Sequence, residues 1–141
     1  MTGTEKPELR AVKVPAPTSL RLSGQATPEV IPAFRHRVRD FAVANSAAAK
    51  VVEAIALAVT EAVTNVVKHA YESEAADRGI WLTGSVADGF LEITVSDRGL
   101  GFRESAWPGL GVGLSIIADM SAELDIDQGS EGTELRMRFP L

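Results

Sequence analysis

The sequence predicts an α+β fold in which helices pack on one face of a mostly antiparallel, mixed sheet. Two consecutive segments between residues 27 and 71 repeat apolar residues at helical spacing, whereas the segments before and after them alternate apolar and polar residues. Asp88-Gly89 is typical of a hairpin turn between antiparallel strands. The length of 141 residues suits one domain that is large enough to bury a core.

The first part of the chain is expected to contain a tail, a strand and a helix. Residues 1–17 carry three prolines among scattered charges without a period, so we expect a disordered tail there and a folded domain over 18–141. A short half-buried strand follows from Ser19 to Gly24. A helix is predicted from Thr27, whose hydroxyl would cap it, to Asn45. Its buried stripe comprises Val30, Phe34, Val38 and Phe41.

The rest of the chain is expected to contain a long helix, four strands and a third helix. Ser46 is predicted to cap the long helix, which runs to about Tyr71. Its buried stripe comprises Val52, Ile55, Val59, Val63, Val66 and Ala70. Strands are predicted at 80–86, 90–96, 122–128 and 133–139, with a glycine-rich loop at 97–113 and a helix to about 120.

The composition excludes several classes of function. The chain has 14 Lys+Arg against 19 Asp+Glu and a net charge of −5, which disfavours a direct nucleic-acid partner. It contains no cysteine, so it has no disulfide, thiolate zinc site or cysteine nucleophile. No apolar run approaches the ~20 residues of a membrane helix, and the polar start lacks a signal-peptide pattern. We therefore expect a cytoplasmic protein without a membrane segment.

Three polar residues share one face of the long predicted helix. Glu61, Asn65 and Lys68 stand at positions i, i+4 and i+7, beside the apolar stripe, so their side chains should border the core. An amide oxygen suits Mg²⁺, a carboxylate can accept a proton from a hydroxyl, and an ammonium group offsets phosphate charge. The pattern fits a metal–phosphate site, and it also fits a solvated face of an amphipathic helix.

Two further features lie at strand ends. Asp97 leaves an apolar strand into a turn that contains Gly99 and Gly101, and Gly132-Thr133 begins the last strand. Each is compatible with a plain turn. In a binding pocket, however, the Asp97 carboxylate would accept a hydrogen bond from an exocyclic amine such as that of adenine, and the glycines would let the backbone approach the ligand.

A run of alternating glycines opens the third predicted helix. Backbone N–H groups are free at a helix start, so Gly109, Gly111 and Gly113 could contribute to an anion site. The run does not fit the dinucleotide-binding fold, because it does not follow a strand in a βαβ unit. It also differs from the GxxxxGK[ST] pattern of the P-loop.

In this order, the four features resemble the N box and the three glycine boxes of the GHKL ATP-binding superfamily, which includes gyrase-type ATPases, heat-shock chaperones, histidine kinases and MutL. The stretches EAVTNVVKHAY, DRGLGF, GLGVGLSII and EGTELRMRF look most like the anti-sigma-factor serine kinases of the RsbW and SpoIIAB kind. The resemblance covers roughly residues 19–141. It implies the superfamily's fold, a two-layer α/β sandwich of the Bergerat type.

The resemblance also implies a role for each matching residue. Asn65 would hold Mg²⁺ beside ATP, and Glu61 would be the general base for the attacking hydroxyl. Lys68 and His69 would lie near the phosphates, and Asp97 would bind the adenine amino group. The other implied nucleotide-binding residues belong to the adenine pocket and the lid: Gly99, Gly101, Gly109, Gly111, Gly113, Leu114 and Thr133.

The function that the resemblance implies is that of a serine protein kinase and anti-sigma factor. Such a protein binds an RNA polymerase sigma factor and phosphorylates a serine of an anti-anti-sigma partner with a STAS domain. A candidate sigma-factor surface is the basic face of the first predicted helix, for which a solvated face is the alternative: Arg35, Arg37 and Arg39. Dimerisation is common in that family, so the resemblance implies a homodimer here.

Two other functions stay open. The domain could be a non-catalytic ATP-binding regulator that controls a partner by nucleotide-dependent binding, or an α+β scaffold that binds no nucleotide. Glu61 favours the kinase over the regulator, because binding alone does not require a base. A histidine kinase is disfavoured, since His36 is followed by Arg37 where the usual phosphoacceptor motif has an acid.

Overall fold

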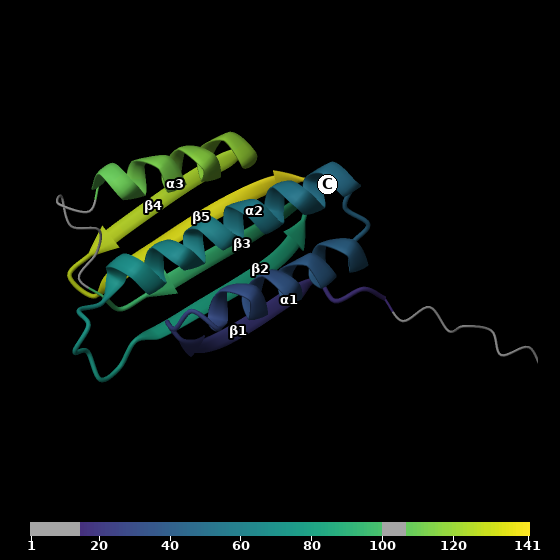
Figure 1. The fold of residues 1–141 in the computed structure, drawn as a ribbon. Helices are drawn as coiled ribbons and strands as arrows, with labels where there is room; N and C mark the ends of the chain where they lie inside the picture. The colour runs from purple at the N-terminus through teal and green to yellow at the C-terminus, as the bar shows by residue number, and fades with distance from the viewer. Residues whose placement is uncertain (1–14, 100–106) are drawn as a thin grey trace, which may run out of the picture.

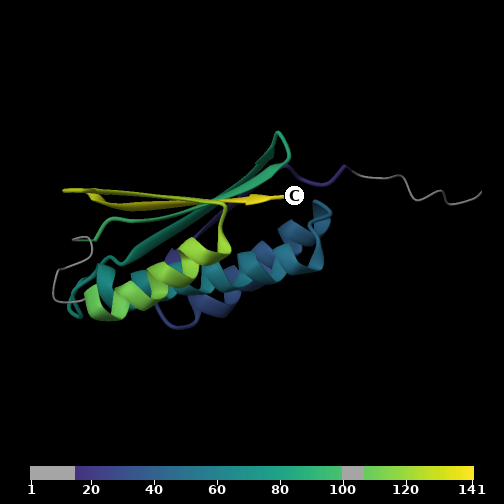
Figure 2. The same ribbon diagram turned by 90° about the horizontal axis from the view of Figure 1, so that it is seen from above.

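A computed structural model describes residues 15–99 and 107–141, with side chains from residue 113 onward in the second range. The described elements form two layers, a sheet and a set of helices that all lie on one of its faces (Figures 1 and 2). In chain order they are β1 (Ser19–Gln25), α1 (Val30–Ala44), α2 (Ala49–Asn65), η1 (Val66–Ala70), β2 (Gly79–Ala87), β3 (Phe90–Asp97), α3 (Trp107–Met120), β4 (Glu123–Gly129) and β5 (Gly132–Pro140).

The sheet confirms the predicted fold class. Its strands lie in the order β1-β2-β3-β5-β4, and each of these neighbouring pairs is antiparallel. Over the described residues the sheet is therefore antiparallel rather than mixed. The β2–β3 hairpin turns at Asp88 and Gly89, which have φ angles of 54° and 78°. Left-handed values at both residues are what a two-residue type I′ turn requires, so the predicted hairpin is confirmed.

The core lies between the sheet and the helices. Alternate residues of the central strand β3 and its neighbour β5 are buried under the helix layer: Leu91, Ile93 and Val95 on β3, and Leu135, Met137 and Phe139 on β5. The predicted stripes of both helices are buried against them, which confirms Val30, Phe34, Val38 and Phe41 on α1 and the stripe from Val52 to Ala70 on α2 and η1. Apolar burial of this kind is the main force that holds the two layers together.

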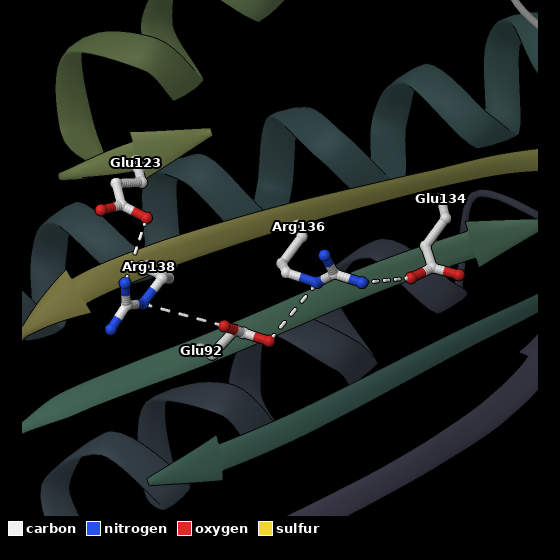
Figure 3. Close-up of polar contacts among 5 residues, drawn as sticks. All are labelled: Glu92, Glu123, Glu134, Arg136 and Arg138. Atoms are coloured by element: carbon white, nitrogen blue, oxygen red, sulfur yellow. Dashed lines mark hydrogen bonds and ion pairs between the residues drawn. The ribbon is translucent and has the colours of Figure 1, made fainter. Parts of the chain in front are cut away.

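The other face of the sheet carries a network of ion pairs (Figure 3). Arg136 Nε lies 3.4 Å from Glu92 Oε1, and Arg136 Nη2 lies 2.8 Å from Glu134 Oε1. Arg138 Nη1 lies 3.1 Å from Glu123 Oε2, and its Nε lies 3.8 Å from Glu92 Oε2. Opposite charges on adjacent antiparallel strands stabilise the pairing modestly. Apolar residues on one face and charged ones on the other explain why these strands alternate in the sequence.

Both predicted helix caps are wrong. α1 begins at Val30 after a turn in which the Thr27 carbonyl accepts a hydrogen bond from the Val30 N–H at 3.0 Å, and no side chain caps the helix. Ser46 has a φ of 62° and lies in the sharp reversal between α1 and α2, whose N-cap residue is Ala48. A residue in the left-handed region cannot take the extended conformation that a capping serine needs, so this serine serves the reversal instead.

The second and third helices also differ from the prediction. The long helix changes at Val66 from an α-helix to a five-residue π-helix, η1. α3 begins at Trp107, so the glycines at 109, 111 and 113 lie within the helix instead of opening it. Pro108 suits the first turn of a helix, where a backbone N–H is not needed, and it is the local signal for the earlier start.

The chain start lies mostly outside the described residues, so the predicted tail stays a prediction. Of its last residues, Pro17 has a carbonyl that accepts a hydrogen bond from Asn45 Nδ2 at 2.9 Å. In the part of the chain that the structure describes, none of the helices has both the length and the apolar character to cross a membrane.

Candidate functional site

Asp97 and Thr133 lie opposite each other where β3 ends and β5 begins. They form a directly opposed pair in the antiparallel ladder, so both side chains point to the helix face. Asp97 is 5% exposed and Thr133 is 4% exposed. Asp97 Oδ1 accepts a hydrogen bond from the Gly99 N–H at 2.8 Å, whereas Thr133 Oγ1 has no partner among residues 15–99 and 107–141. A buried carboxylate and a buried, unpartnered hydroxyl are thus adjacent, which favours a polar ligand.

Burial has a direct effect on the Asp97 carboxylate. Loss of water raises the pKa of Asp97, and this effect exceeds the opposite effect of hydrogen bonds from the backbone N–H groups of Gly99 and Thr133. A carboxylate has room for about four hydrogen bonds, so these two donors leave it able to accept from a ligand amine.

Glu61 and Asn65 meet at Gly113 of α3. A Cβ atom on Gly113 would lie 3.2 Å from Asn65 Oδ1 and 3.3 Å from both Asn65 Nδ2 and Glu61 Oε2. Asn65 is 5% exposed, and its Nδ2 has no hydrogen-bond partner in the described part of the chain. Glu61 is half-buried. A carboxylate and an amide whose nitrogen has no partner in the described residues therefore lie together against a glycine, as the predicted shared face requires.

The Asp97 turn packs directly against the helix that carries Asn65. A Cβ atom on Gly99 would lie only 2.0 Å from the carbonyl oxygen of Ala70, so no side chain fits there. Ala70 ends η1, which continues α2 directly after Asn65. In Figure 1 the ends of α2 and β3 and the starts of β5 and α3 all lie at the left end of the molecule. Both pairs of polar residues therefore belong to one end of the domain.

Lys68 does not share the position of Glu61 and Asn65. It lies in η1, where each turn takes more residues than in an α-helix, so the predicted i+7 relation is lost after Asn65. Lys68 is exposed and His69 is half-buried. Both lie on the helical segment that directly follows Asn65, and the flexible, positively charged side chain of a lysine suits a phosphate group.

The predicted lid residues are only partly described. Gly101 lies outside the described residues, and Gly109 and Gly111 belong to the first half of α3. Leu114, predicted to contact the nucleotide, is partly buried and packs against the hydrophobic core. Of these residues, Gly113 is the one that the structure places against Glu61 and Asn65.

The three arginines of α1 do not form one exposed face. Arg39 donates to both oxygens of Glu53 on α2, at 3.2 and 2.6 Å. Arg35 Nη1 lies 3.5 Å from Thr60 Oγ1, also on α2. Arg37 is exposed. Because Arg35 and Arg39 are one helical turn apart, they lie along the α1–α2 junction and Arg37 points elsewhere.

The sequence patterns do not predict the residues that surround the Asp97 turn. Tyr71 donates its hydroxyl hydrogen to the Gly79 carbonyl and accepts from the Arg98 N–H at 2.8 Å. The Arg98 guanidinium lies 4.6 Å from the centre of the Trp81 ring. A cavity of about 360 Å³ adjoins Tyr71, Arg98 and Gly99, and another of about 520 Å³ adjoins Trp81, Arg98 and Thr133. The one sequence signal for this cluster is Tyr71, the aromatic residue that directly follows His69 and Ala70.

These residues fit a magnesium-bound nucleotide. Asn65 offers a buried amide whose Nδ2 has no partner among the described residues, and Gly113 places no side chain against it. Amide and carboxylate oxygens are hard ligands suited to Mg²⁺. At the other side of the site, Asp97 can accept from an amine and Thr133 can donate. The donor set matches a purine at one side and a metal–phosphate group at the other.

Fold and site together define a nucleotide-binding domain of the ATPase class. The chain belongs to the histidine kinase-like ATPase domain family, whose sequence model matches residues 24–139. ATP binding is the property that this family implies, and kinases are among the relatives. The predicted GHKL resemblance is confirmed.

The chain is similar in sequence to parts of two histidine kinases. A blue-light-activated histidine kinase 2 of Erythrobacter litoralis is 34% identical over 94 residues, which cover 62% of this chain and 27% of the relative. The sensor histidine kinase PdtaS of Mycobacterium tuberculosis is 31% identical over 114 residues, which cover 75% of this chain and 22% of the relative. The chain thus matches about a quarter of the length of these relatives.

Solved structures give the same family. A structure of the RsbU and RsbW domains of Rv1364c from Mycobacterium tuberculosis has a TM-score of 0.72 and 25% identity, and the match covers 87% of this chain and 32% of that one. The histidine kinase domain of the blue-light-activated kinase from Erythrobacter litoralis has a TM-score of 0.57 and 26% identity, with 84% and 65% coverage. The chain is therefore a GHKL ATPase domain similar to an RsbW-containing protein and to histidine kinases.

Proposed function

We propose that this protein is an ATP-dependent serine kinase and anti-sigma factor in the cytoplasm. It binds an RNA polymerase sigma factor and phosphorylates a serine of a STAS-type anti-anti-sigma partner. The likeness to a structure that contains an RsbW domain supports this assignment, because it covers 87% of the chain. The observation that carries the proposal is the convergence of Glu61 and Asn65 on Gly113, since nucleotide binding alone needs no carboxylate there.

The nucleotide lies between α2, the end of the sheet and α3. Asp97 accepts from the adenine amino group, and the Thr133 hydroxyl supports that end of the ligand. Gly99 and Gly101 shape the adenine pocket. The phosphates lie toward Lys68 and His69, and toward the backbone of the lid glycines Gly109, Gly111 and Gly113, with Leu114 anchoring the lid helix in the core.

Phosphoryl transfer mainly requires positioning and charge neutralisation. Asn65 would bind Mg²⁺, which neutralises charge on the phosphates when it is present. Glu61 accepts the proton of the partner's serine hydroxyl as the serine oxygen bonds to the γ-phosphorus. The bond from that phosphorus to the bridging oxygen breaks, and ADP leaves with the electron pair. Lys68 offsets the negative charge of the phosphates.

The sigma-factor surface includes α1, and Arg37 is its exposed member. Arg35 and Arg39 contact α2, so they shape this surface rather than present free charges. An acidic segment of a sigma factor would pair with Arg37 and with the exposed edge of Arg39, which keeps 41% of its side chain exposed. A homodimer, which is common among the kinases of this kind, would place two such surfaces in one assembly.

The experiment compares the unchanged protein with Glu61→Gln. Calorimetry with Mg-ATP measures binding, and label transfer from γ-labelled ATP to small STAS-domain proteins of the same genome measures phosphorylation. We expect both proteins to bind ATP within about threefold of each other, and the variant to lose transfer by at least about a hundredfold, as for other general bases. Glu53→Gln, which removes an exposed carboxylate of the same helix, is the matched control and should leave both properties unchanged.

The outcomes separate the competing functions. Transfer that survives Glu61→Gln with normal ATP binding refutes Glu61 as the base. Nucleotide-dependent binding of a partner without any transfer supports the non-catalytic regulator. No binding heat and no thermal shift at millimolar Mg-ATP leaves a scaffold without nucleotide, because a ligand that binds the folded state must stabilise it.

A further inference from the structure

The hydroxyl of Tyr71 joins three segments of the chain at the nucleotide end of the domain. Tyr71 directly follows η1. Its hydroxyl donates to the carbonyl of Gly79, the first residue of β2, and accepts from the backbone N–H of Arg98 at 2.8 Å. A hydroxyl carries one hydrogen and two lone pairs, so the donated and accepted bonds are compatible. One phenol therefore links the long helix, the start of β2 and the turn that follows β3.

That turn sets the direction of the Asp97 side chain. The Gly99 N–H, one residue beyond the Arg98 N–H, donates to Asp97 Oδ1 at 2.8 Å. The backbone of Gly99 also contacts Ala70 so closely that a Cβ atom would overlap its carbonyl. The Arg98 N–H lies between these two anchors and is bonded to Tyr71. The two consecutive N–H groups after Asp97 thus have different partners, and the Tyr71 bond ties the turn to the residue that follows η1.

The side chain of Arg98 is anchored as well. Its guanidinium lies over the Trp81 ring at 4.6 Å from the ring centre, on β2. Gly79 permits this arrangement, because a Cβ atom there would lie 2.5 Å from the Trp81 ring. Burial is the main reason that the pKa of Tyr71 is raised, so the phenol keeps its hydrogen at neutral pH and remains a donor.

We propose that Tyr71 is a positioning residue for adenine recognition, which acts by orienting the Asp97 turn through the Arg98 backbone. This inference rests on the proposed nucleotide site and adds a residue to it. Tyr71 touches no part of the nucleotide in this assignment. Its effect is expected at the purine end of the ligand, because its partners Gly79 and Arg98 adjoin the Asp97 turn, whereas Glu61 and Asn65 lie against Gly113 of α3.

The test replaces Tyr71 with Phe, which removes the hydroxyl and keeps the ring. Calorimetry measures the Kd of Mg-ATP and of Mg-ITP, whose purine carries a carbonyl oxygen in place of the amino group that Asp97 accepts from. The unchanged protein should prefer ATP. In Tyr71→Phe the affinity for ATP should fall about tenfold while that for ITP changes less than about twofold, so the preference shrinks. Binding of Mg-tripolyphosphate, which has no purine, should not change.

Asn45→Ala is the matched control. It also removes side-chain hydrogen bonds to backbone carbonyls, those of Pro17 and Phe41, at the residue that follows α1. In Figure 1 the end of α1 lies opposite the ends of α2 and β3. This variant should lower the thermal midpoint and leave the ATP/ITP ratio unchanged. If Tyr71→Phe weakens both nucleotides by the same factor, or leaves the ratio as it was, Tyr71 is structural and the inference is overturned.

A second measurement does not depend on the variant being folded. In the unchanged protein, hydrogen exchange of the Arg98 amide should be at least about tenfold slower than in an unstructured peptide, although Arg98 is exposed, because the amide is bonded to Tyr71. Exchange at the unstructured rate overturns the inference. If the unchanged protein binds no ATP, the proposed function fails together with it; if it prefers ATP and only the tests of Tyr71 fail, the proposed function stands.

Discussion

Two chemically identical substitutions should change the stability of this domain in opposite directions. The Thr133 hydroxyl is buried and has no partner within the described residues. The Thr60 hydroxyl donates to the Ala56 carbonyl at 2.7 Å and lies 3.5 Å from Arg35 Nη1. Threonine and valine have the same shape, so Thr→Val replaces a hydroxyl with a methyl group at each site. Thr133→Val should stabilise the nucleotide-free protein, whereas Thr60→Val should destabilise it.

The magnitudes follow from the state of each hydroxyl. A buried polar group without a partner costs about 1–3 kcal/mol, so Thr133→Val should raise the free energy of unfolding by about 1 kcal/mol. A bonded hydroxyl contributes about 1 kcal/mol, which Thr60→Val should remove. For a domain of this length, 1 kcal/mol corresponds to roughly 3–4 °C in the midpoint of thermal unfolding. The two variants should therefore differ by about 2 kcal/mol.

The affinity for Mg-ATP should not follow the stability of the two variants. Thr133 is proposed to support the adenine end of the nucleotide, so Thr133→Val should weaken Mg-ATP binding about tenfold, the equivalent of one hydrogen bond. Thr60→Val should leave the affinity unchanged. Urea unfolding without nucleotide, followed through the two tryptophans, measures stability, and calorimetry measures binding. If Thr133→Val destabilises the protein as much as Thr60→Val does, the reasoning from an unpartnered hydroxyl is refuted.

Two further predictions test the same end of the domain. Burial raises the pKa of Asp97 above 3.8, so the folded protein binds more protons than the unfolded chain between the two pKa values, and stability falls as pH rises through that window. The Asn side chain of Asp97→Asn is neutral at every pH, so this loss does not affect the variant. In urea unfolding, the free energy of unfolding of the variant relative to that of the unchanged protein should therefore increase from about pH 4 to about pH 7. A difference that does not change with pH would contradict the raised pKa. Gly113→Ala should gain about 1 kcal/mol of helix propensity but crowd Asn65 and Glu61, whose atoms would lie 3.2–3.3 Å from the new Cβ. We expect thermal unfolding at an equal or higher temperature and a loss of at least about tenfold in ATP affinity; unchanged binding by calorimetry would show that these side chains have room to move.

The sequence predicts most of the fold because its apolar periodicity is regular. Three local patterns agree with the structure: the buried stripes of α1 and α2, the alternation of β3 and β5, and the turn at Asp88-Gly89. Tertiary packing does not override any of them. The helix starts were mispredicted for a physical reason as well. Thr27 and Ser46 belong to a turn and a chain reversal, whose geometry depends on where the neighbouring elements pack and not on the capping residue alone.

The site could be predicted only in part. The i, i+4 spacing correctly places Glu61 beside Asn65, because both precede the end of the α-helix. The same spacing does not place Lys68 correctly, because the helix changes to a π-helix at Val66 and the local sequence does not predict this change. The contact between Gly99 and Ala70 depends on how β3 packs against η1, and periodicity carries no information about such a contact.

The features that break local rules converge on one end of the domain, and this convergence supports a ligand site independently of any resemblance. Asn65 Nδ2 and Thr133 Oγ1 are buried without partners in the described chain, and Gly113 lies in the interior of a helix. At about 1–3 kcal/mol for each buried group and about 1 kcal/mol for the glycine, their joint cost is roughly 3–7 kcal/mol. That is a large share of the ~5–15 kcal/mol that stabilises a typical domain. A ligand present at a thousand times its Kd stabilises the folded state by about 4 kcal/mol. A bound nucleotide can therefore offset this cost, whereas a scaffold that binds no ligand would remain destabilised by it.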